Sequence, residues 1–240
     1  MDIKYGYKIK MTNNPICIEF IGIWGAGKTT LINELVKKLQ NEGVVVARIL
    51  DFDNQTMLKR YLSIGLFFLR HPLYIFKSLF FLIKILNILR PIDGLQIDVL
   101  KTLIRIHIKK NIIMEKKPDI FLCEGAYHLF PMFKRMNKLK EKDILFFGST
   151  NFSYHSNSAV YIDIDTDAAI KRVMKDNENN IVRLDINNLN KLDHLCDRMI
   201  NNQNKIISIL KLSAIPVLNI NGRESLTKKI MNLFNFIKEI

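Results

Sequence analysis

Eight consecutive residues near the start of the chain have the types and spacing of a loop that binds phosphate. Residues 22–29, Gly-Ile-Trp-Gly-Ala-Gly-Lys-Thr, fit the pattern G-x-x-x-x-G-K-[ST]. Glycines in such a loop let successive backbone N–H groups turn toward phosphate oxygens, and the positive end of the following helix adds to the attraction. Lys28 would bridge the outer phosphates and Thr29 would hold Mg²⁺. The residues predicted to contact a nucleotide are Gly22, Trp24, Gly25, Ala26, Gly27, Lys28, Thr29 and Thr30.

The segments on either side of the loop have the patterns that such a loop needs. Ile16 to Ile21 is an apolar run interrupted only by Glu19, typical of a buried strand. After the loop, apolar residues mark one face of a helix: Leu31, Ile32, Leu35, Val36 and Leu39. This setting favours a phosphate loop over the alternative, an ordinary glycine turn.

Five short apolar runs predict a parallel sheet. They are residues 16–21, 44–50, 119–124, 159–163 and 215–220. Helical patterns separate the runs, as expected for an α/β fold with crossover helices, and continuous hydrophobicity suits strands covered on both faces. One helix is predicted to start near Thr166, and a longer one to run from Leu189 to Leu210.

Carboxylates follow the second and third predicted strands. Asp51 and Asp53 come after the second strand, and Glu124 ends the third. Ligands of open parallel sheets bind beyond the carboxyl ends of the strands, so Asp53 is a candidate for orienting an acceptor and Glu124 for positioning Mg²⁺. The alternatives are that the aspartates begin a helix and that Glu124 pairs with a lysine.

Phosphoryl transfer also needs positive charge near the migrating group, and the segment after the fourth strand supplies it. Arg172 and Arg183 are the catalytic candidates, and Lys175 is a third cation of the same segment. The polar stretch 175–180 is predicted to be a flexible flap. The alternative is that these residues are solvated surface charges.

Residues 55–117 carry much of the chain's formal net charge of +13, with twelve Lys or Arg against three acidic residues. Tyr61 to Arg90 is almost continuously apolar, with Pro72 predicted to start a helix. Basic residues interrupt the run before it reaches the roughly 20 apolar residues of a spanning helix, so the sequence predicts no membrane crossing. Three interpretations stay open: a buried helix of a helical lobe, a homodimer surface, and a helix lying on a membrane surface.

Composition and spacing argue against several other classes of protein. Three scattered cysteines fit a reducing compartment, and the first fourteen residues lack the apolar stretch of a signal peptide, so we expect a cytoplasmic protein. The histidines have no metal-hydrolase spacing, and nucleic-acid binding has only bulk charge in its favour. Residues 190–193 match the guanine-reading N-K-x-D pattern, but they fall inside a helical periodicity, which argues against a GTPase switch.

The order of these features resembles that of P-loop nucleotide kinases, and most closely the thymidylate kinase-like group. The resemblance covers most of the chain and implies a three-layer P-loop NTPase fold with a five-stranded parallel sheet and a helical acceptor and lid region. It implies one kinase domain over residues 1–240, with residues 55–117 inserted between the second and third strands. Lys28, Thr29 and Arg172 would serve the donor side and Asp53 the acceptor side.

The implied activity is transfer of the γ-phosphate of ATP, with Mg²⁺, to a nucleoside monophosphate such as dTMP. The sequence departs from the family at Trp24, at residues 52–54 and at residues 124–126, where the family has an acidic residue, Arg-Glu-Pro and Asp-Arg-Tyr. The acceptor-binding arginines are therefore missing. Alternatives are another small or lipid-linked acceptor, for example a saccharide, and a nucleotide-binding switch or scaffold without phosphotransfer.

Overall fold

The computed structural model describes residues 15–90, 93–148, 156–178 and 189–240, and in these residues the sheet has five strands. Their order is β2-β3-β1-β4-β5, and every neighbouring pair is parallel. The strands are β1 (Ile16–Ile21), β2 (Val46–Arg48), β3 (Ile120–Cys123), β4 (Ser156–Asp163) and β5 (Val217–Asn221). The predicted five-stranded parallel sheet is confirmed.

Helices connect the strands. They are α1 (Lys28–Asn41), α2 (Ile49–Asp53), α3 (Met57–Arg70), α4 (Pro72–Leu89), α5 (Gly94–Met114), α6 (Ala126–Leu129), α7 (Glu141–Gly148), α8 (Thr166–Glu178), α9 (Leu189–Leu212) and α10 (Leu226–Glu239). Two short 3₁₀ helices, Phe130–Met132 and Met136–Lys138, lie between α6 and α7. The predicted helix starts at Thr166 and Pro72 are confirmed, and residues 190–193 lie within α9.

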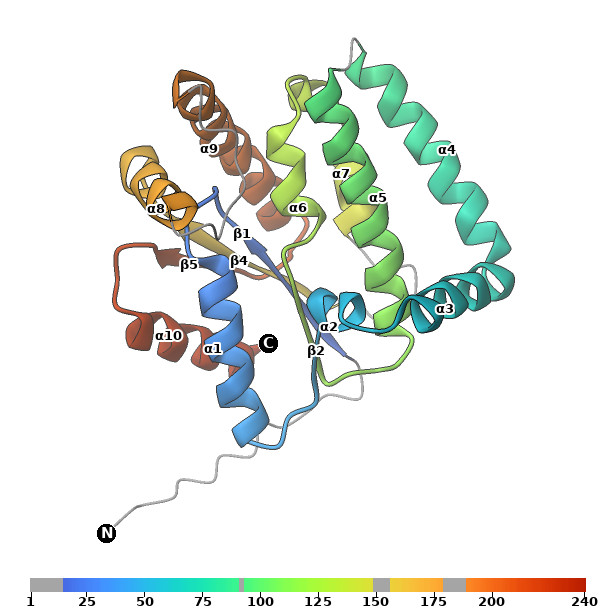
Figure 1. Cartoon of the computed structure of the whole chain (residues 1–240), viewed down its shortest axis with the longest axis horizontal. Coiled ribbons are helices and arrows are strands. Elements are labelled where there is room, and N and C mark those ends of the chain that lie inside the picture. Colours follow the sequence, from blue (N-terminus) through green and yellow to red (C-terminus); the bar gives the residue numbers. More distant parts are fainter. Residues whose placement is uncertain (1–14, 91–92, 149–155, 179–188) are drawn as a thin grey trace.

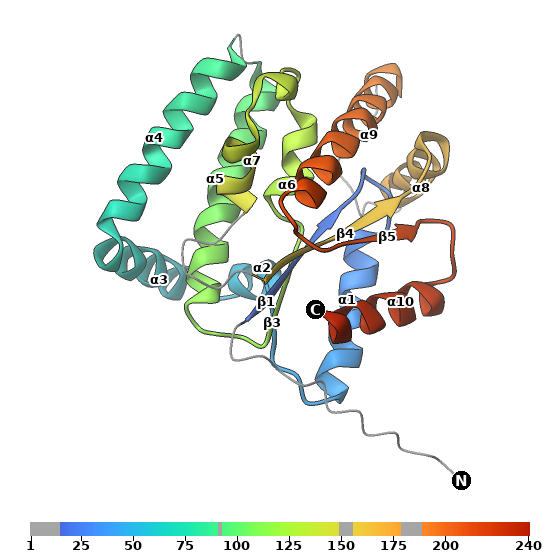
Figure 2. The ribbon, with the colours of Figure 1, turned by 180° about the vertical axis from the view of Figure 1, so that it is seen from behind.

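The sheet lies between two helical layers (Figures 1 and 2). Helices α1 and α10 pack together on one face, and α5, α6 and α9 cover the other. This division follows from right-handed crossovers, because the chain moves along the sheet in one direction through α1 and in the other through α5 to α9. The result is the predicted three-layer α/β fold.

The central strands and the predicted apolar face of α1 form the core. All six residues of β1 and all four of β3 are buried, whereas β2 at one edge is only partly covered. Every apolar residue predicted to face the core from α1 is buried. The first strand therefore enters the phosphate loop from the middle of the sheet, and α1 leaves the loop along one face.

The second predicted strand, residues 44–50, is mostly not a strand. Only Val46–Arg48 pair with β3, and the chain then turns into the short helix α2. The backbone N–H of Arg48 donates to Asp51 Oδ2 at 3.0 Å, which caps this helix and ends the strand. The predicted flap is also wrong for residues 175–178, which extend α8.

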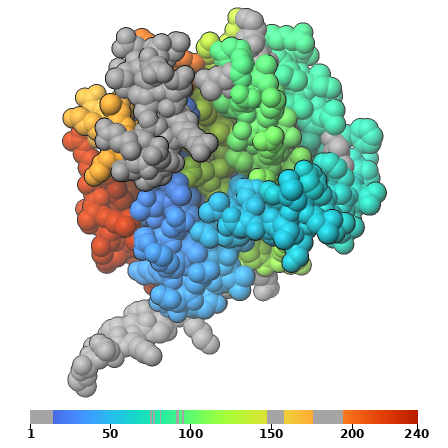
Figure 3. All heavy atoms as spheres, in the orientation of Figure 1, coloured from blue at the N-terminus to red at the C-terminus, as the bar shows by residue number. Residues whose placement is uncertain are grey.

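Helices α3 and α4 form the outer edge of the molecule on the side away from α10 (Figures 1 and 3). Their inner faces are packed, with Phe67, Ile85 and Leu89 buried. Their outer faces carry many exposed apolar side chains: Met57, Leu58, Tyr61, Leu62, Leu66, Leu69, Leu73, Phe76, Leu79, Phe80 and Ile83. We call this set the α3–α4 apolar surface.

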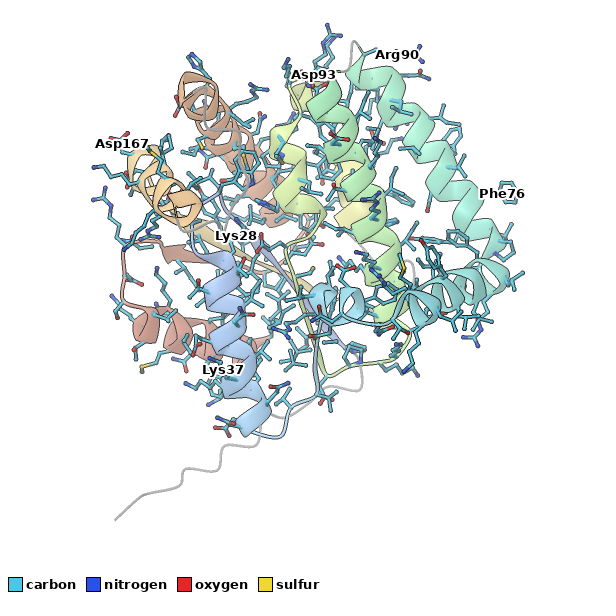
Figure 4. All side chains as sticks on the ribbon, in the orientation of Figure 1. Lys28, Lys37, Phe76, Arg90, Asp93 and Asp167 are labelled. Atoms are coloured by element: carbon cyan, nitrogen blue, oxygen red, sulfur yellow. The ribbon has the colours of Figure 1, made fainter. Side chains whose placement is uncertain are left out.

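The α3–α4 apolar surface corrects the interpretation of residues 61–90 as a buried helix. Leu73 is 83% exposed and Phe76 is 73% exposed, and Figure 4 shows Phe76 pointing away from the rest of the molecule. In the described part of the chain, α4 is also long and apolar enough to cross a membrane, by length and composition alone. The expectation that basic residues leave no stretch long and apolar enough for a membrane-spanning helix was therefore wrong.

Candidate active site

The loop after β1 has the backbone conformation of a phosphate cradle. Gly25 and Gly27 have φ angles of +74° and +87°, which favour glycine. A Cβ on Gly25 would lie 2.3 Å from the carbonyl oxygen of Ala169, so α8 packs directly against the loop. Helix α1 begins at Lys28 and has no side-chain cap, which leaves its first N–H groups available to a phosphate.

Lys28 is buried beneath this loop (Figure 4). Its Nζ donates to the carbonyl oxygens of Gly22 at 3.1 Å and Ile23 at 3.0 Å, and lies 3.7 Å from Glu124 Oε2. Burial lowers the pKa of Lys28, and the Glu124 carboxylate opposes this only partly. A bound triphosphate would supply negative charge to pair with this ammonium group, which Glu124 compensates only in part.

Thr29 and Glu124 lie side by side at the carboxyl end of the sheet. Thr29 Oγ1 donates to Glu124 Oε1 at 2.8 Å, joining α1 to the end of β3. A hydroxyl and a carboxylate are oxygen ligands of the kind Mg²⁺ prefers, and Mg²⁺ in such sites takes its other ligands from phosphates and water. Among the described residues, no group of three or more His, Cys, Asp or Glu that could hold a metal occurs.

His128 is a neighbour of the site that the sequence did not reveal, because histidine spacing alone gave no signal. It is buried on α6, and its Nε2 lies 4.0 Å from Glu124 Oε2. Burial, and next the positive charge of Lys28, hold the pKa of His128 well below its ordinary value. His128 is therefore neutral beside the predicted phosphate site, and its Nδ1 has no hydrogen-bond partner within the described ranges of the chain.

A cavity of about 940 Å³ opens over the phosphate loop. Its lining residues are Trp24, Gly25, Ala26, Gly27, Lys28, Thr29, Thr30, Leu31, Glu124, Ile162, Arg172, Val173, Glu224, Leu226 and Lys229. Most of the predicted nucleotide contacts and Arg172 are thus brought together; Gly22 lies beneath the loop instead, where its carbonyl holds Lys28. Lys229 on α10, which the sequence did not single out, adds a third cation beside Lys28 and Arg172.

Arg172 is held against the loop. Its guanidinium donates to the carbonyl oxygens of Gly25 at 3.3 Å and Gly222 at 3.2 Å, and Lys229 Nζ donates to the same Gly222 oxygen at 2.6 Å. Lys175 is one turn further along α8 and is not among the lining residues. Arg183 lies outside the described residues.

A second cavity, of about 230 Å³, lies on the other side of Thr29 and Glu124. It is lined by Thr29, Ile32, Asn33, Arg48, Ile49, Leu50, Asp53, Ile106, Leu122, Cys123 and Glu124. Asp53 lines this cavity from the end of helix α2, where it forms an ion pair with Lys109, and its role toward an acceptor stays a prediction. Thr29 and Glu124 border both cavities.

A buried ion pair supports the site from below. Lys110 Nζ donates to Glu19 Oε1 at 2.7 Å, and the backbone N–H of Tyr127 donates to Glu19 Oε2 at 3.1 Å. A Cβ on Gly125 would lie 2.3 Å from Glu19 Cδ, so only glycine fits after Glu124. The course of the chain from Glu124 to α6 thus depends on a carboxylate in the core.

Comparison with solved structures gives only distant similarity. One is a deoxyadenosine kinase from M. mycoides with the products dCMP and a flexible dCDP bound, 14% identical over 94% of this chain and 100% of that chain, with a TM-score of 0.48. The same kinase with dCTP bound is 15% identical over 94% of this chain and 100% of that chain, with a TM-score of 0.47. The crystal structure of APE1195 is 12% identical over 96% of this chain and 99% of that chain, with a TM-score of 0.47. Similarity at this level carries no argument about activity. No curated protein matches by sequence.

A family model gives a clearer result. The model described as the KAP family P-loop domain matches residues 4–238, which is nearly the whole chain. The prediction of a nucleotide-binding P-loop fold is confirmed by this match and by the sheet, whereas the thymidylate kinase assignment stays a prediction. By its phosphate loop, its strand order and this match, the chain belongs to the KAP family of P-loop NTPase domains.

Proposed function

We propose that this P-loop domain is a Mg²⁺-dependent phosphotransferase that uses ATP. The observation that carries the proposal is the position of Thr29 and Glu124, which border both the cavity over the phosphate loop and the second cavity. A kinase needs a donor and an acceptor on opposite sides of the transferred phosphoryl group. On this proposal the larger cavity holds ATP, the second cavity holds the acceptor, and residues 55–117 form a helical insertion in one kinase domain.

Each polar group of the site has a role in this scheme. Lys28 stabilises charge on the β- and γ-phosphates, and Arg172 stabilises charge on the migrating group, with Arg183 as the further predicted cation. Thr29 and Glu124 hold Mg²⁺, which neutralises charge on the phosphate oxygens when bound. Asp53 orients the acceptor.

The acceptor implied by the resemblance is a nucleoside monophosphate such as dTMP. A saccharide or a lipid-linked hydroxyl compound is the alternative, because Asp53 and Asn54 stand where the related kinases carry Glu and Pro after an arginine. A nucleotide-binding switch or scaffold would use only the larger cavity. These options differ in what raises the rate of ATP consumption.

The test measures ADP formation by the purified chain with ATP and Mg²⁺, alone and with nucleoside monophosphates, nucleosides and sugars. Lys28→Ala should lower ATP turnover by ~100- to 1,000-fold and leave the fold intact. Lys37→Ala, which removes an exposed lysine paired with Glu34 on the same helix, should not change turnover. Stimulation by an acceptor supports phosphotransfer. Basal hydrolysis that no acceptor changes supports the switch or scaffold, and wild-type-like turnover by Lys28→Ala contradicts the proposed site.

We also propose that the α3–α4 apolar surface binds an anionic membrane surface. The supporting observation is an extended exposed apolar face in a segment of one charge sign, since residues 57–90 contain six Lys or Arg and no Asp or Glu. Apolar side chains with flanking basic residues suit the boundary of an anionic bilayer. Two copies joined through this face would bring like charges together, which disfavours the homodimer alternative.

Vesicle flotation tests this second proposal. The chain should float with vesicles of phosphatidylcholine and phosphatidylserine, and less with phosphatidylcholine alone. A Leu73→Asp/Phe76→Asp variant should lose the interaction, whereas Met231→Asp, at an exposed apolar position on α10, should keep it. Failure to bind anionic vesicles contradicts the proposal, and a concentration-dependent dimer lost in the double variant would favour the homodimer. Resistance to alkaline extraction would indicate that α4 crosses the bilayer.

A further inference from the structure

The second cavity has the charge pattern of a site for an uncharged molecule. We infer that the phosphoryl acceptor is a small neutral compound with a hydroxyl group, and not a phosphate monoester; this inference rests on the proposed phosphotransfer. A site for a nucleoside monophosphate needs a cation that can pair with the acceptor phosphate. The cations that the structure describes at or near this cavity already form hydrogen bonds or ion pairs with other groups.

Arg48 is the only cation among the described residues that line the cavity, and its guanidinium is occupied. Its Nη2 donates to Asp51 Oδ1 at 2.6 Å, its Nε also contacts Asp51, and its Nη1 donates to Asn33 Oδ1 at 2.9 Å. This is the bidentate geometry in which arginine holds a carboxylate. An acceptor phosphate would have to displace Asp51.

The other charged side chains that the structure describes near the cavity are carboxylates or lysines that already have partners. Lys109 is paired with Asp53, and Lys28 donates to two backbone carbonyls on the far side of Glu124. The carboxylates of Asp53 and Glu124 both line the space. A dianionic phosphate would meet these two carboxylates, and Arg48, the one cation among the described lining residues, is already held by Asp51. Like-charge contacts of this kind disfavour binding. A hydroxyl group would instead donate a hydrogen bond to either carboxylate.

The rest of the lining is apolar and fits the body of a small molecule. Ile32, Ile49, Leu50, Ile106 and Leu122 supply most of the wall. At about 230 Å³ the cavity is smaller than the roughly 300–1,000 Å³ of common ligand pockets. The acceptor is therefore small, with an apolar or flat body and its hydroxyl at the Asp53–Glu124 end.

The reaction balances with the groups present. The hydroxyl oxygen of the acceptor forms a bond to the γ-phosphorus of ATP, and the bond from that phosphorus to the β,γ-bridging oxygen breaks, with its electron pair leaving on ADP. The hydroxyl proton passes to the carboxylate of Asp53, whose pairing with Lys109 uses Oδ1. The products are ADP, the phosphorylated acceptor and one proton.

The experiment compares neutral compounds with their own monophosphates. ADP formation is measured with thymidine, deoxyadenosine and glucose, each beside its phosphate ester at equal concentration. At least one neutral compound should stimulate the rate ~10-fold or more over its ester. Asp53→Asn should lower the stimulated rate by ~100-fold, whereas Asp98→Asn, an exposed carboxylate on α5, should not change it.

A second variant makes the charge argument specific. Asp51→Asn leaves the Arg48 guanidinium without its carboxylate partner, so a monophosphate should then bind and stimulate where it did not before. Equal or stronger stimulation of the wild-type chain by a monophosphate overturns the inference. Lys28-dependent hydrolysis that no compound stimulates also overturns it, while leaving nucleotide turnover intact; absence of any Lys28-dependent turnover rejects the proposed function itself.

Discussion

Two buried lysines, each beside a glutamate, occupy different regions of this molecule. Lys110 and Glu19 lie in the core at 2.7 Å, and both side chains are almost fully buried. Lys28 is 5% exposed, but Glu124, 3.7 Å away at the sheet edge, is 31% exposed. The core pair is closed to solvent, whereas the pair at the edge opens to two cavities.

The difference in geometry changes what each lysine can do. Burial alone would lower the pKa of Lys110, but the charges of Cys17 and then of Glu19, which is in direct contact, outweigh burial and raise that pKa above its ordinary value. For Lys28, burial dominates and the pKa is lowered. Lys110, in direct contact with its carboxylate, forms a structural ion pair. Lys28, whose carboxylate is 3.7 Å away, can still gain electrostatic energy by binding an anionic ligand.

The core pair should give the largest effect on stability. Lys110→Met leaves the Glu19 carboxylate buried without its cation, so the free energy of unfolding should fall by about 3–5 kcal/mol. Urea denaturation measures this change. The double variant Glu19→Leu/Lys110→Met should regain much of the loss, and a double variant no better than the sum of its single changes would contradict the pairing.

The edge pair should give the largest effect on activity. Lys28→Ala should reduce kcat/KM for ATP by ~100- to 1,000-fold, because the transferred phosphate loses its main cation. It should also remove any rise of Tm caused by ATP and Mg²⁺. The Tm of the ligand-free variant should stay close to that of the wild-type chain. An unfolded variant would show that Lys28, like Lys110, is needed for stability, which contradicts the comparison.

Gly125 connects the two regions, and its substitution should disturb both. A Cβ there would lie within 2.3 Å of Glu19 Cδ, so Gly125→Ala must move the carboxylate or the chain that follows Glu124. We expect a loss of about 1–3 kcal/mol in unfolding free energy and a reduced rate of ATP turnover. Gly94→Ala, at a site with no heavy atom near its Cβ, is the matched control.

The smallest effect concerns pH. The folded state holds the pKa of His128 well below 6.5, so below about pH 6.5 the unfolded chain binds a proton that the folded chain does not. Stability should therefore fall as the pH decreases, by up to about 1.4 kcal/mol per pH unit from this group. His128→Gln should flatten the stability profile between pH 7 and 5, whereas His194→Gln on the exposed surface should leave it unchanged.

The sequence predicted the elements whose pattern is local. The phosphate loop could be identified because its residue types are fixed by backbone contact with phosphate, and β1 and α1 because their apolar residues follow the periods of a strand and a helix. The Arg48–Asp51 contact shortened the second predicted strand. A cap of this kind depends on side-chain geometry at a few residues, which a run of apolar residues does not reveal.

By itself, the sequence determined a parallel α/β fold and a phosphate loop with Lys28 and Thr29, since both follow from residue type and spacing along the chain. Only the tertiary structure decided which charges are paired. It placed Lys110 against Glu19 across 91 residues, committed Arg48 and Lys109 to carboxylates beside the second cavity, and exposed the apolar faces of α3 and α4. Pairing and exposure depend on which helices pack against the sheet, and residues distant in sequence set that packing.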